Sequence, residues 1–530
     1  MSGGRKRSVV FACYLVAACT TKSPTQSSGN GGATASGGVA SAGGATATGG
    51  ITGSGGITSS GGATSSGGVT TGTSSTGGMG LTGGTVGTGG VTSNGGATGS
   101  GGVASTGGTK ATGGVTSSGG MTSSGGATGG TTSSGGNTAT GGATSSGGAT
   151  SSTGVAYPFP QNHKGSYCTY PTSHDNDKVK SAYQAWKDAT VTSDGASGFQ
   201  RVKKPDSGTV IGSTVSEGIG YGMILAVYMN DQKLFDNLWN YEQLYLDGNG
   251  LMNWEIGPDG KITSGGTGAA TDGDEDMAWS LVMADRQWGG KGALSDTYLG
   301  HAKKLIGLIW NFEVDHSRGE MLKPGDQWGN VDVTNPSYFA PAYYRVFGQV
   351  TGKVDDWNKV VTGNYDILER SLNAKSGNAD IGLVPAWCDS SGTPISPFSG
   401  APMYFQNDST RTPFRVGQDY CFFGEPRAKS YLAKITSFYV GVGVANIVDG
   451  YALDGTPKAD RAVSGAQAAS FIGPAGVGAM SNAKYQAFLD AAYADVATLN
   501  LTAGTIYYQK SWTALSLLMM TANLMDFTQF

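Results

Sequence analysis

A repeating tract rich in glycine, threonine and serine fills most of the first 154 residues, and it limits what the chain can fold into. Residues 55–60 (Gly-Gly-Ile-Thr-Ser-Ser) and 61–66 (Gly-Gly-Ala-Thr-Ser-Ser) illustrate its six-residue pattern. A period of this kind raises the alternative of a repetitive β-helix. Each unit offers one small apolar side chain, too little burial to offset an ordering cost of about 1–2 kcal/mol per residue. We therefore expect a disordered low-complexity linker over residues 19–154 and one folded domain over residues 155–530.

Charge and composition divide the chain at the same place. Residues 1–154 contain 49 of the 91 glycines and none of the 38 acidic residues, whereas residues 155–530 combine 29 basic with 38 acidic side chains. A domain with a net charge of −9 is unsuited to binding nucleic acid. The absence of a Gly-X-Y period excludes collagen.

The amino terminus has the features of an export signal. Residues 5–7 (Arg-Lys-Arg) precede an apolar run over residues 9–18, which is shorter than the about 20 residues of a membrane-spanning helix. Small residues stand before Cys19, as in bacterial lipoprotein signals. We expect residues 1–18 to be a signal peptide and Cys19 to be lipidated, so that the protein contacts a bacterial outer membrane or cell surface only through its lipid. The alternative is an ordinary secretory peptide and a secreted protein.

Apolar side chains recur at three- and four-residue spacing after Pro160, which is typical of helices. Strand patterns are few and short, so we expect an all-α domain with long loops that suit a binding site. Residues 473–478 are interpreted as a glycine-rich connection between helices. The predicted helices cover residues 178–190, 218–230, 233–246, 274–287, 296–312, 337–348, 355–372, 425–448, 458–471, 482–498 and 508–526.

Three cysteines follow the signal and the linker: Cys168, Cys388 and Cys421. They allow at most one disulfide within the chain, and their spacing does not identify the pair. We favour Cys388–Cys421, because both lie near the segment that contains Asp408. The chain has no CxxC pair and no HExxH motif, so we expect neither a zinc site nor a cofactor.

The densest acidic cluster covers residues 270–276 (Ala-Thr-Asp-Gly-Asp-Glu-Asp), directly before an apolar run. Carboxylates there can cap a helix, and we assign Asp274, Glu275 and Asp276 mostly to that role. A calcium loop is excluded, because methionines stand at the sixth and twelfth positions. Asp272 could instead bind a polar ligand.

Two further acids lie outside that cluster. Glu217 stands among glycines where an apolar helix is predicted to begin, and a solvated glutamate is the alternative to a functional one. Asp408 has Arg411 and Arg415 close by in sequence, which favour its ionised form. On its own, such a pattern most often forms a structural ion pair.

Two tryptophans lie in polar, glycine-containing loops rather than in periodic helices. Trp254 and Trp328 are therefore candidate platforms for the flat apolar face of a sugar, with loop packing as the alternative.

Together these segments resemble glycoside hydrolase family 8, in its cellulase-like subgroup. The resemblance extends over residues 183–524 and rests on four groups of residues: 270–288, 216–222 (Ser-Glu-Gly-Ile-Gly-Tyr-Gly), 335–341 (Asn-Pro-Ser-Tyr-Phe-Ala-Pro), and Tyr507-Tyr508 with the apolar run after them. It implies an (α/α)₆ barrel of six inner and six outer helices. It also implies hydrolysis of a β-1,4-linked polysaccharide.

The resemblance assigns roles residue by residue. Glu217 matches the general acid, Asp408 the general base, Asp272 the residue that holds the distorted sugar ring, and Tyr338 a tyrosine that positions the water. Arg411 follows the base at the family's spacing and is expected to bind substrate.

One position departs from the family pattern. The residue before the base is usually tyrosine, and here it is Asn407. Glu425 is the nearest substitute for Asp408 as the base.

The sequence thus predicts a monomeric, inverting, endo-acting enzyme whose partner is a polysaccharide, most simply cellulose or β-glucan. A xylanase, less readily a chitosanase, and a non-catalytic polysaccharide-binding surface protein are the alternatives.

Overall fold

The computed structural model describes residues 155–530 apart from residues 209, 459–466 and 502–503. The predicted signal peptide, Cys19 and the predicted linker lie outside the described residues.

Helices dominate the described part of the chain, where twelve α-helices are joined by loops and by three short antiparallel strand pairs. The strand pairs are β1 (Val191–Thr192) with β2 (Arg201–Val202), β3 (Thr214–Val215) with β4 (Glu255–Ile256), and β5 (Val314–Asp315) with β6 (Met321–Leu322). The helices are α1 (Asn176–Thr190), α2 (Ser216–Tyr228), α3 (Gln232–Glu242), α4 (Thr271–Trp288), α5 (Tyr298–Phe312), α6 (Pro341–Thr351), α7 (Val354–Ser371), α8 (Arg411–Phe423), α9 (Pro426–Val442), α10 (Ala469–Ala479), α11 (Gln486–Ala497) and α12 (Ile506–Met520).

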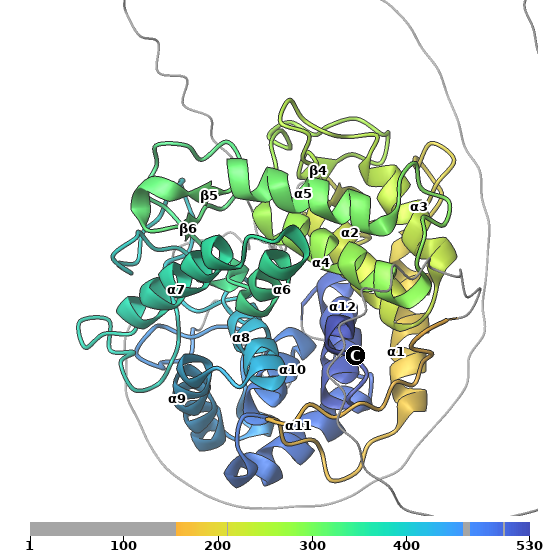
Figure 1. The fold of residues 1–530 in the computed structure, drawn as a ribbon. Coiled ribbons are helices and arrows are strands. Elements are labelled where there is room, and N and C mark those ends of the chain that lie inside the picture. The colour runs from red at the N-terminus through yellow and green to blue at the C-terminus, as the bar shows by residue number, and fades with distance from the viewer. Residues whose placement is uncertain (1–154, 209, 459–466, 502–503) are drawn as a thin grey trace, which may run out of the picture. The chain divides into compact units, whose positions relative to one another are not determined.

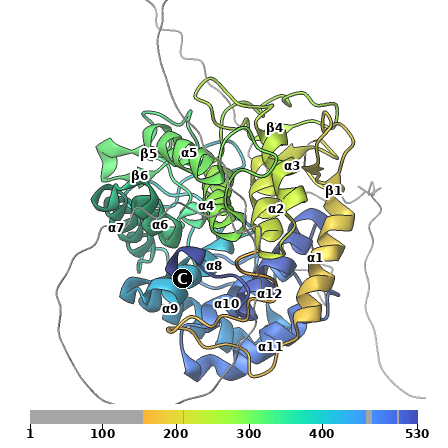
Figure 2. The ribbon, with the colours of Figure 1, turned by 45° about the vertical axis from the view of Figure 1, so that its right-hand side comes forward.

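The helices form two concentric layers (Figures 1 and 2). Helices α2, α4, α6, α8, α10 and α12 contact one another in that order, and α12 returns to α2, which closes an inner ring. Each outer helix contacts an inner neighbour: α1 packs on α12, α3 on α2, α5 on α4, α7 on α6, α9 on α8 and α11 on α10. This arrangement is an (α/α)₆ barrel and confirms the predicted fold class.

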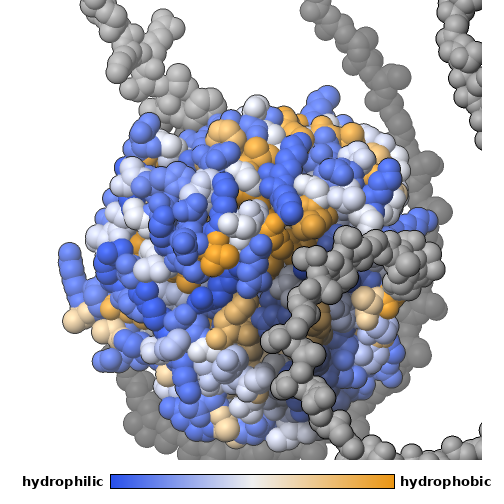
Figure 3. Space-filling view, viewed as in Figure 1, coloured by the Kyte–Doolittle hydropathy of each residue, from blue (hydrophilic) through white to orange (hydrophobic). Residues whose placement is uncertain are grey.

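Burial separates the layers. Helix α10 is buried along its whole length and α2 at every residue except Glu217, whereas outer helices such as α5 and α7 bury one side only. An amphipathic stripe suits an outer helix, and an apolar helix suits a core position. Hydrophilic side chains accordingly cover most of the face shown in Figure 3.

Periodicity fails to reveal two inner helices, α8 and α10. Of the helix predicted over residues 458–471, residues 459–466 lie outside the described part, Ala468 is extended, and the helix starts at Ala469 and continues to Ala479. Residues 473–478 are therefore helical and not a connection. Their glycines serve close packing, because a Cβ at Gly473 would lie 2.2 Å from Ser516 Oγ on α12.

The predicted disulfide is also wrong: Cys421 is bonded to Cys168, and Cys388 is a buried free cysteine. Cys421 lies near the carboxyl end of α8, about 15 Å of helix away from Arg411. The segment of residues 155–175 crosses that end of the barrel, where His163 N donates to Ala522 O and Thr169 N to Met480 O. Proximity to Asp408 in sequence was therefore misleading, because a helix separates the two positions in space.

None of the described helices is both long enough and apolar enough to cross a membrane.

Candidate active site

A cleft lies where four inner helices begin. Glu217 is in the first turn of α2, Asp272 in the first turn of α4, Arg411 at the start of α8 and Tyr507 at the start of α12. The space between their side chains amounts to about 600 Å³, including the part open to solvent. The cleft is lined by Lys204, Val215, Ser216, Glu217, Trp254, Ala270, Asp272, Tyr338, Asn407, Asp408, Arg411, Tyr507 and Tyr508.

Glycines let α2 and α4 approach each other closely enough to bring their carboxylates together. A Cβ at Gly273 would lie 2.7 Å from the backbone and hydroxyl of Ser216, and one at Gly220 would lie 2.8 Å from Asp276 Cβ. The glycines around the two acids in the sequence therefore set the distance between the helices.

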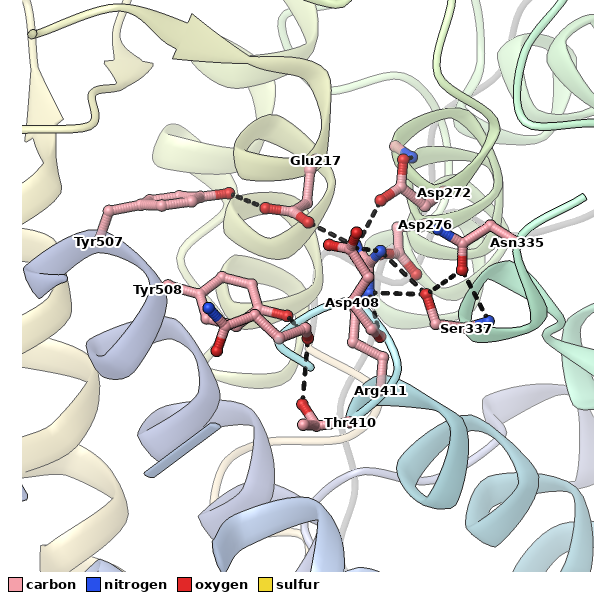
Figure 4. A network of polar contacts seen from close by, with 12 residues as sticks. Glu217, Asp272, Asp276, Asn335, Ser337, Asp408, Thr410, Arg411, Tyr507 and Tyr508 are labelled. Atoms are coloured by element: carbon pink, nitrogen blue, oxygen red, sulfur yellow. Dashed lines mark hydrogen bonds and ion pairs between the residues drawn. The ribbon is translucent and has the colours of Figure 1, made fainter. Parts of the chain in front are cut away.

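Arg411 stands at the centre of three carboxylates (Figure 4). Its NH1 donates to Glu217 Oε2 at 2.5 Å and to Asp272 Oδ2 at 2.6 Å, and its NH2 is 3.6 Å from Asp408 Oδ1. We call Glu217, Asp272 and Asp408 with Arg411 the arginine cluster. Because Glu217 and Asp408 contact one guanidinium, they are no farther apart than the roughly 6.5–9.5 Å of an inverting acid–base pair.

The carboxylates of the arginine cluster differ in their access to the cleft. The side chains of Glu217 and Asp408 are 18% and 16% exposed, whereas Asp272 is 4% and Arg411 1% exposed. The two expected proton-transfer groups are thus the ones that can meet a ligand.

The environment of Glu217 favours proton donation near neutral pH. Burial is the largest influence and raises the pKa of Glu217 to about 7, while Arg411 lowers it and Asp272 raises it. Burial also raises the pKa of Asp272, against the opposing effect of Arg411. A carboxyl group with a pKa near the working pH is suited to general acid catalysis.

Asp408 is held by its own loop. Gln406 Nε2 donates to Asp408 Oδ2 at 2.9 Å. Asn407 lines the cleft, and its backbone oxygen accepts a hydrogen bond from Tyr508 at 2.6 Å. Glu425, the alternative base, is instead at the start of α9 and pairs with Arg345.

The structure brings Tyr338 and Trp254 to the same cleft but not Trp328. The ring of Tyr338 lies 4.9 Å from the Arg411 guanidinium, and Trp254 Nε1 donates to Gly265 O at 2.7 Å. Trp328 stacks on Trp387 at 6.1 Å in a small separate apolar cluster and does not line this cavity.

The prediction that Asp274, Glu275 and Asp276 mostly cap the start of a helix is wrong. Asp276 and Glu275 pair with Arg415, and Asp274 lies near Glu313. The start of α4 has no side-chain cap from its N-cap residue. The reason is position: these acids are on a buried inner helix, where they face other helices.

Sequence reasoning assigned no role to several residues in and around the arginine cluster. Ser337 Oγ accepts from Arg411 NH2 at 3.0 Å, and Asn335 Oδ1 in turn accepts from Ser337 Oγ at 2.8 Å. Tyr507 donates to Glu217 Oε1 at 2.7 Å, and Lys204 pairs with the buried Glu255 beside Trp254. Asn335 precedes a proline and could have been identified as a turn residue, but nothing local marks Lys204.

Among the described residues, no group of three or more His, Cys, Asp or Glu side chains could hold a metal ion.

An acid of raised pKa that faces a second carboxylate in a cleft is the arrangement with which glycoside hydrolases cleave a glycosidic bond. The chain belongs to the glycosyl hydrolases family 8, whose family model matches residues 160–522. It is 41% identical over 347 residues to Endoglucanase A of Acetivibrio thermocellus, covering 65% of this chain and 69% of that protein. Endoglucanase 2 of Ruminiclostridium josui is 41% identical over 330 residues, covering 61% and 68%.

A solved structure supports the same assignment. The apo structure of a β-1,3-1,4-glucanase from Paenibacillus sp. X4 is 30% identical, with a TM-score of 0.63 over 70% of this chain and 99% of that one.

Proposed function

We propose that this protein is an inverting endo-β-1,4-glucanase that cleaves cellulose or a soluble β-glucan. The observation that carries the proposal is the arginine cluster, in which Glu217, with a pKa of about 7, shares Arg411 with Asp408. Its relatives named endoglucanases, at 41% identity, support the choice of substrate.

In the proposed reaction, Glu217 gives its proton to the glycosidic oxygen while the bond from that oxygen to C1 breaks. Asp408 takes a proton from water, whose oxygen attacks C1 from the opposite face. Asp272, fixed by Arg411, binds the sugar ring in the cleaving subsite. Tyr338 positions the water, and Trp254 stacks on a sugar face.

A substrate panel tests the proposed activity. The full chain should release reducing sugar from carboxymethylcellulose or lichenan, and less or none from xylan and chitosan. Faster release from xylan would favour the xylanase alternative, and from chitosan the chitosanase. Binding without release from any of the four would favour a non-catalytic polysaccharide-binding protein.

The proposed acid is tested with Glu217→Gln. Loss of general acid catalysis should lower kcat by at least about 10²-fold. Glu369→Gln is the matched control, because Glu369 is 54% exposed and pairs with Arg427 on the surface. Equal rates in the two variants would remove Glu217 from the role.

The stereochemistry is tested by proton NMR of the first products. Inversion should release the α-anomer first, and an initial β-anomer would contradict it.

For the amino-terminal region, we propose a lipoprotein-type signal over residues 1–18, a lipid on Cys19 and a flexible tether over residues 19–154. The Cys168–Cys421 disulfide supports an exported protein, because such bonds persist in oxidising compartments. About 130 residues of flexible chain would give the domain a reach of roughly 60–70 Å. Labelled lipid should enter the wild type but not Cys19→Ala; equal labelling would instead fit a secreted protein.

A further inference from the structure

Tyr507 contacts the one oxygen of Glu217 that Arg411 leaves free. Its hydroxyl donates to Oε1 at 2.7 Å, while Arg411 NH1 donates to Oε2 at 2.5 Å. The two donors come from different inner helices and approach the carboxyl group from opposite sides (Figure 4). Each oxygen of the acid therefore has its own donor.

The phenol of Tyr507 has little freedom to leave this position. Tyr507 is 1% exposed, and a Cβ at Gly218 would lie 3.2 Å from both its Cε2 and its hydroxyl oxygen. The glycine that follows Glu217 thus leaves just enough room for the ring. Packing fixes the ring, and the hydrogen bond then fixes the carboxyl group.

The two oxygens of Glu217 meet partners of different chemistry. Arg411 NH1 can only donate, and besides Oε2 it donates to Asp272 Oδ2 at 2.6 Å. The hydroxyl of Tyr507 donates to Oε1 when Glu217 is ionised and can also accept from it when Glu217 is protonated, so it remains a partner in both states. Burial and the nearby Glu217 hold the pKa of Tyr507 well above its ordinary value, so the phenol keeps its proton and can donate to the ionised acid.

We propose that Tyr507 is the positioning residue of the general acid: its hydroxyl holds Oε1 and thereby fixes the orientation of the carboxyl group, with Oε2 toward the cleft. This inference rests on the proposed role of Glu217. Oε2 is on the side of Asp272 and Asp408, where the sugar must bind (Figure 4).

The proton transfer then has a defined course. The O–H bond of Glu217 breaks, the proton passes to the glycosidic oxygen, and the electrons of the C1–O bond leave with the departing sugar. The carboxylate that remains keeps the hydrogen bond from Tyr507, which strengthens as negative charge develops. The titratable and charged groups that act on Glu217 in this state are Arg411, Asp272, Tyr507, Asp408, Tyr221 and Tyr508.

The test is Tyr507→Phe, which removes the hydroxyl and keeps the ring beside Gly218. We expect kcat to fall about tenfold or more, with little change in KM. The alkaline limb of kcat/KM should move to higher pH, because the variant loses a donor that stabilises ionised Glu217. A merely structural tyrosine would leave this limb where it is.

Tyr365→Phe is the matched control, because it deletes a buried hydroxyl that donates to a carboxylate, Asp419 Oδ2, at 2.6 Å outside the cleft. It should keep the wild-type pH profile. Folding of each variant is checked by thermal unfolding. If Tyr507→Phe does not fold, Gly218→Ala, which displaces the phenol, should shift the limb in the same direction.

An unchanged limb in the folded variant, or an equal shift in Tyr365→Phe, would overturn the inference. If Glu217→Gln is inactive while Tyr507→Phe keeps the wild-type limb, the inference alone fails. If Glu217→Gln keeps wild-type activity, the proposed function fails first.

Discussion

Asp272 and Asp274 are two residues apart on α4, and both are buried, at 3% and 0% exposure. Asp272 belongs to the arginine cluster. Asp274 instead lies near Glu313 and Glu242, and we call these three acids the carboxyl cluster. One helix therefore carries two identical side chains into opposite electrostatic environments.

No arginine of the described residues acts on the carboxyl cluster. Burial raises the pKa of Glu313 and of Glu242 to about 8, and burial followed by the charge of Glu313 raises that of Asp274 well above its ordinary range. The buried carboxylate oxygens of Asp274 and Glu313 accept no hydrogen bond of ordinary geometry from the described residues. Thr271 and Asp274 are close enough to Glu313 to lower its pKa, against the larger effect of burial. A proton shared between Asp274 and Glu313 is the donor that we expect there.

The difference shows how a buried acid on an inner helix is accommodated. A guanidinium that spans several carboxylates stabilises their charges, whereas acids without one retain protons. In the cleft Arg411 opposes the effect of burial, so that the pKa of Glu217 is about 7 and this acid can give up its proton near neutral pH. Behind the cleft the pKa of Asp274 is well above its ordinary range, and this acid keeps its proton.

The largest loss of stability and activity is expected for Arg411→Met, which removes the cation that distinguishes the two clusters. Removing the guanidinium leaves three carboxylates without their shared cation, so we expect a loss of about 3–5 kcal/mol in the free energy of unfolding and loss of activity. Urea unfolding measures the first quantity. Arg427→Met is the control, because Arg427 pairs with Asp366 and Glu369, which are 46% and 54% exposed, and should cost less than about 1 kcal/mol. Equal costs would mean that the arginine cluster is not special.

A second test exchanges one acid of each cluster for its amide. Asp272→Asn removes a charge that Arg411 holds in the cleft and should lower kcat by about 10²-fold or more, as for loss of a transition-state contact. Asp274→Asn replaces a protonated acid behind the cleft and should change kcat by less than about tenfold. Rates on one soluble β-glucan measure both. A larger loss in Asp274→Asn would give the carboxyl cluster a catalytic role.

The neutral state of the carboxyl cluster predicts a pH dependence of stability. Folded Glu313 keeps its proton up to about pH 8, while the unfolded side chain loses it near 4.5. The folded state thus binds more protons, so stability decreases as pH rises between these values, by at most about 1.4 kcal/mol per pH unit for this group. Glu313→Gln should remove that part of the slope. Urea midpoints at several pH values check this, and parallel curves for wild type and variant would contradict it.

Sequence reasoning predicted the fold well where burial is one-sided. The apolar periodicity of α5 and α7 can be recognised in the sequence because only one face of each helix is buried. Helix α10 is buried all round and contains glycines and Pro474, a composition that imitates a loop. Helix α8 starts with polar residues and Pro413 that serve the cleft. The missed helices are therefore inner ones, whose composition reflects contacts and not exposure.

The site was predictable as a set of segments but not as a network. The resemblance pointed to Asp272 and to Asp408, but the residue types in 270–276 do not by themselves show that Asp272 meets a cation and Asp274 does not. Their partners come from far along the chain: Arg411 begins α8, and Glu313 follows α5. Only the packing of these helices decides which acid meets a cation.

The smallest effect is expected for Lys323, a cation beside the carboxyl cluster. Its variant tests whether a lysine stabilises buried acids as an arginine does. Lys323 is 8% exposed, lies beside the carboxyl cluster and lowers the pKa of Glu313, but its ammonium donates to the backbone oxygen of Asp326 at 3.2 Å and not to a carboxylate. Lysine offers a single point charge, whereas the arginine fork binds several oxygens at once. In Lys323→Met the pH at which Glu313 loses its proton in the folded state should therefore rise by less than about one unit. The free energy of unfolding near neutral pH should fall by less than about 1.4 kcal/mol. Urea midpoints against pH, with the exposed Lys303→Met as control, measure both. A cost of about 3–5 kcal/mol, equal to that expected for Arg411→Met, would show that Lys323 holds the carboxyl cluster as Arg411 holds its own.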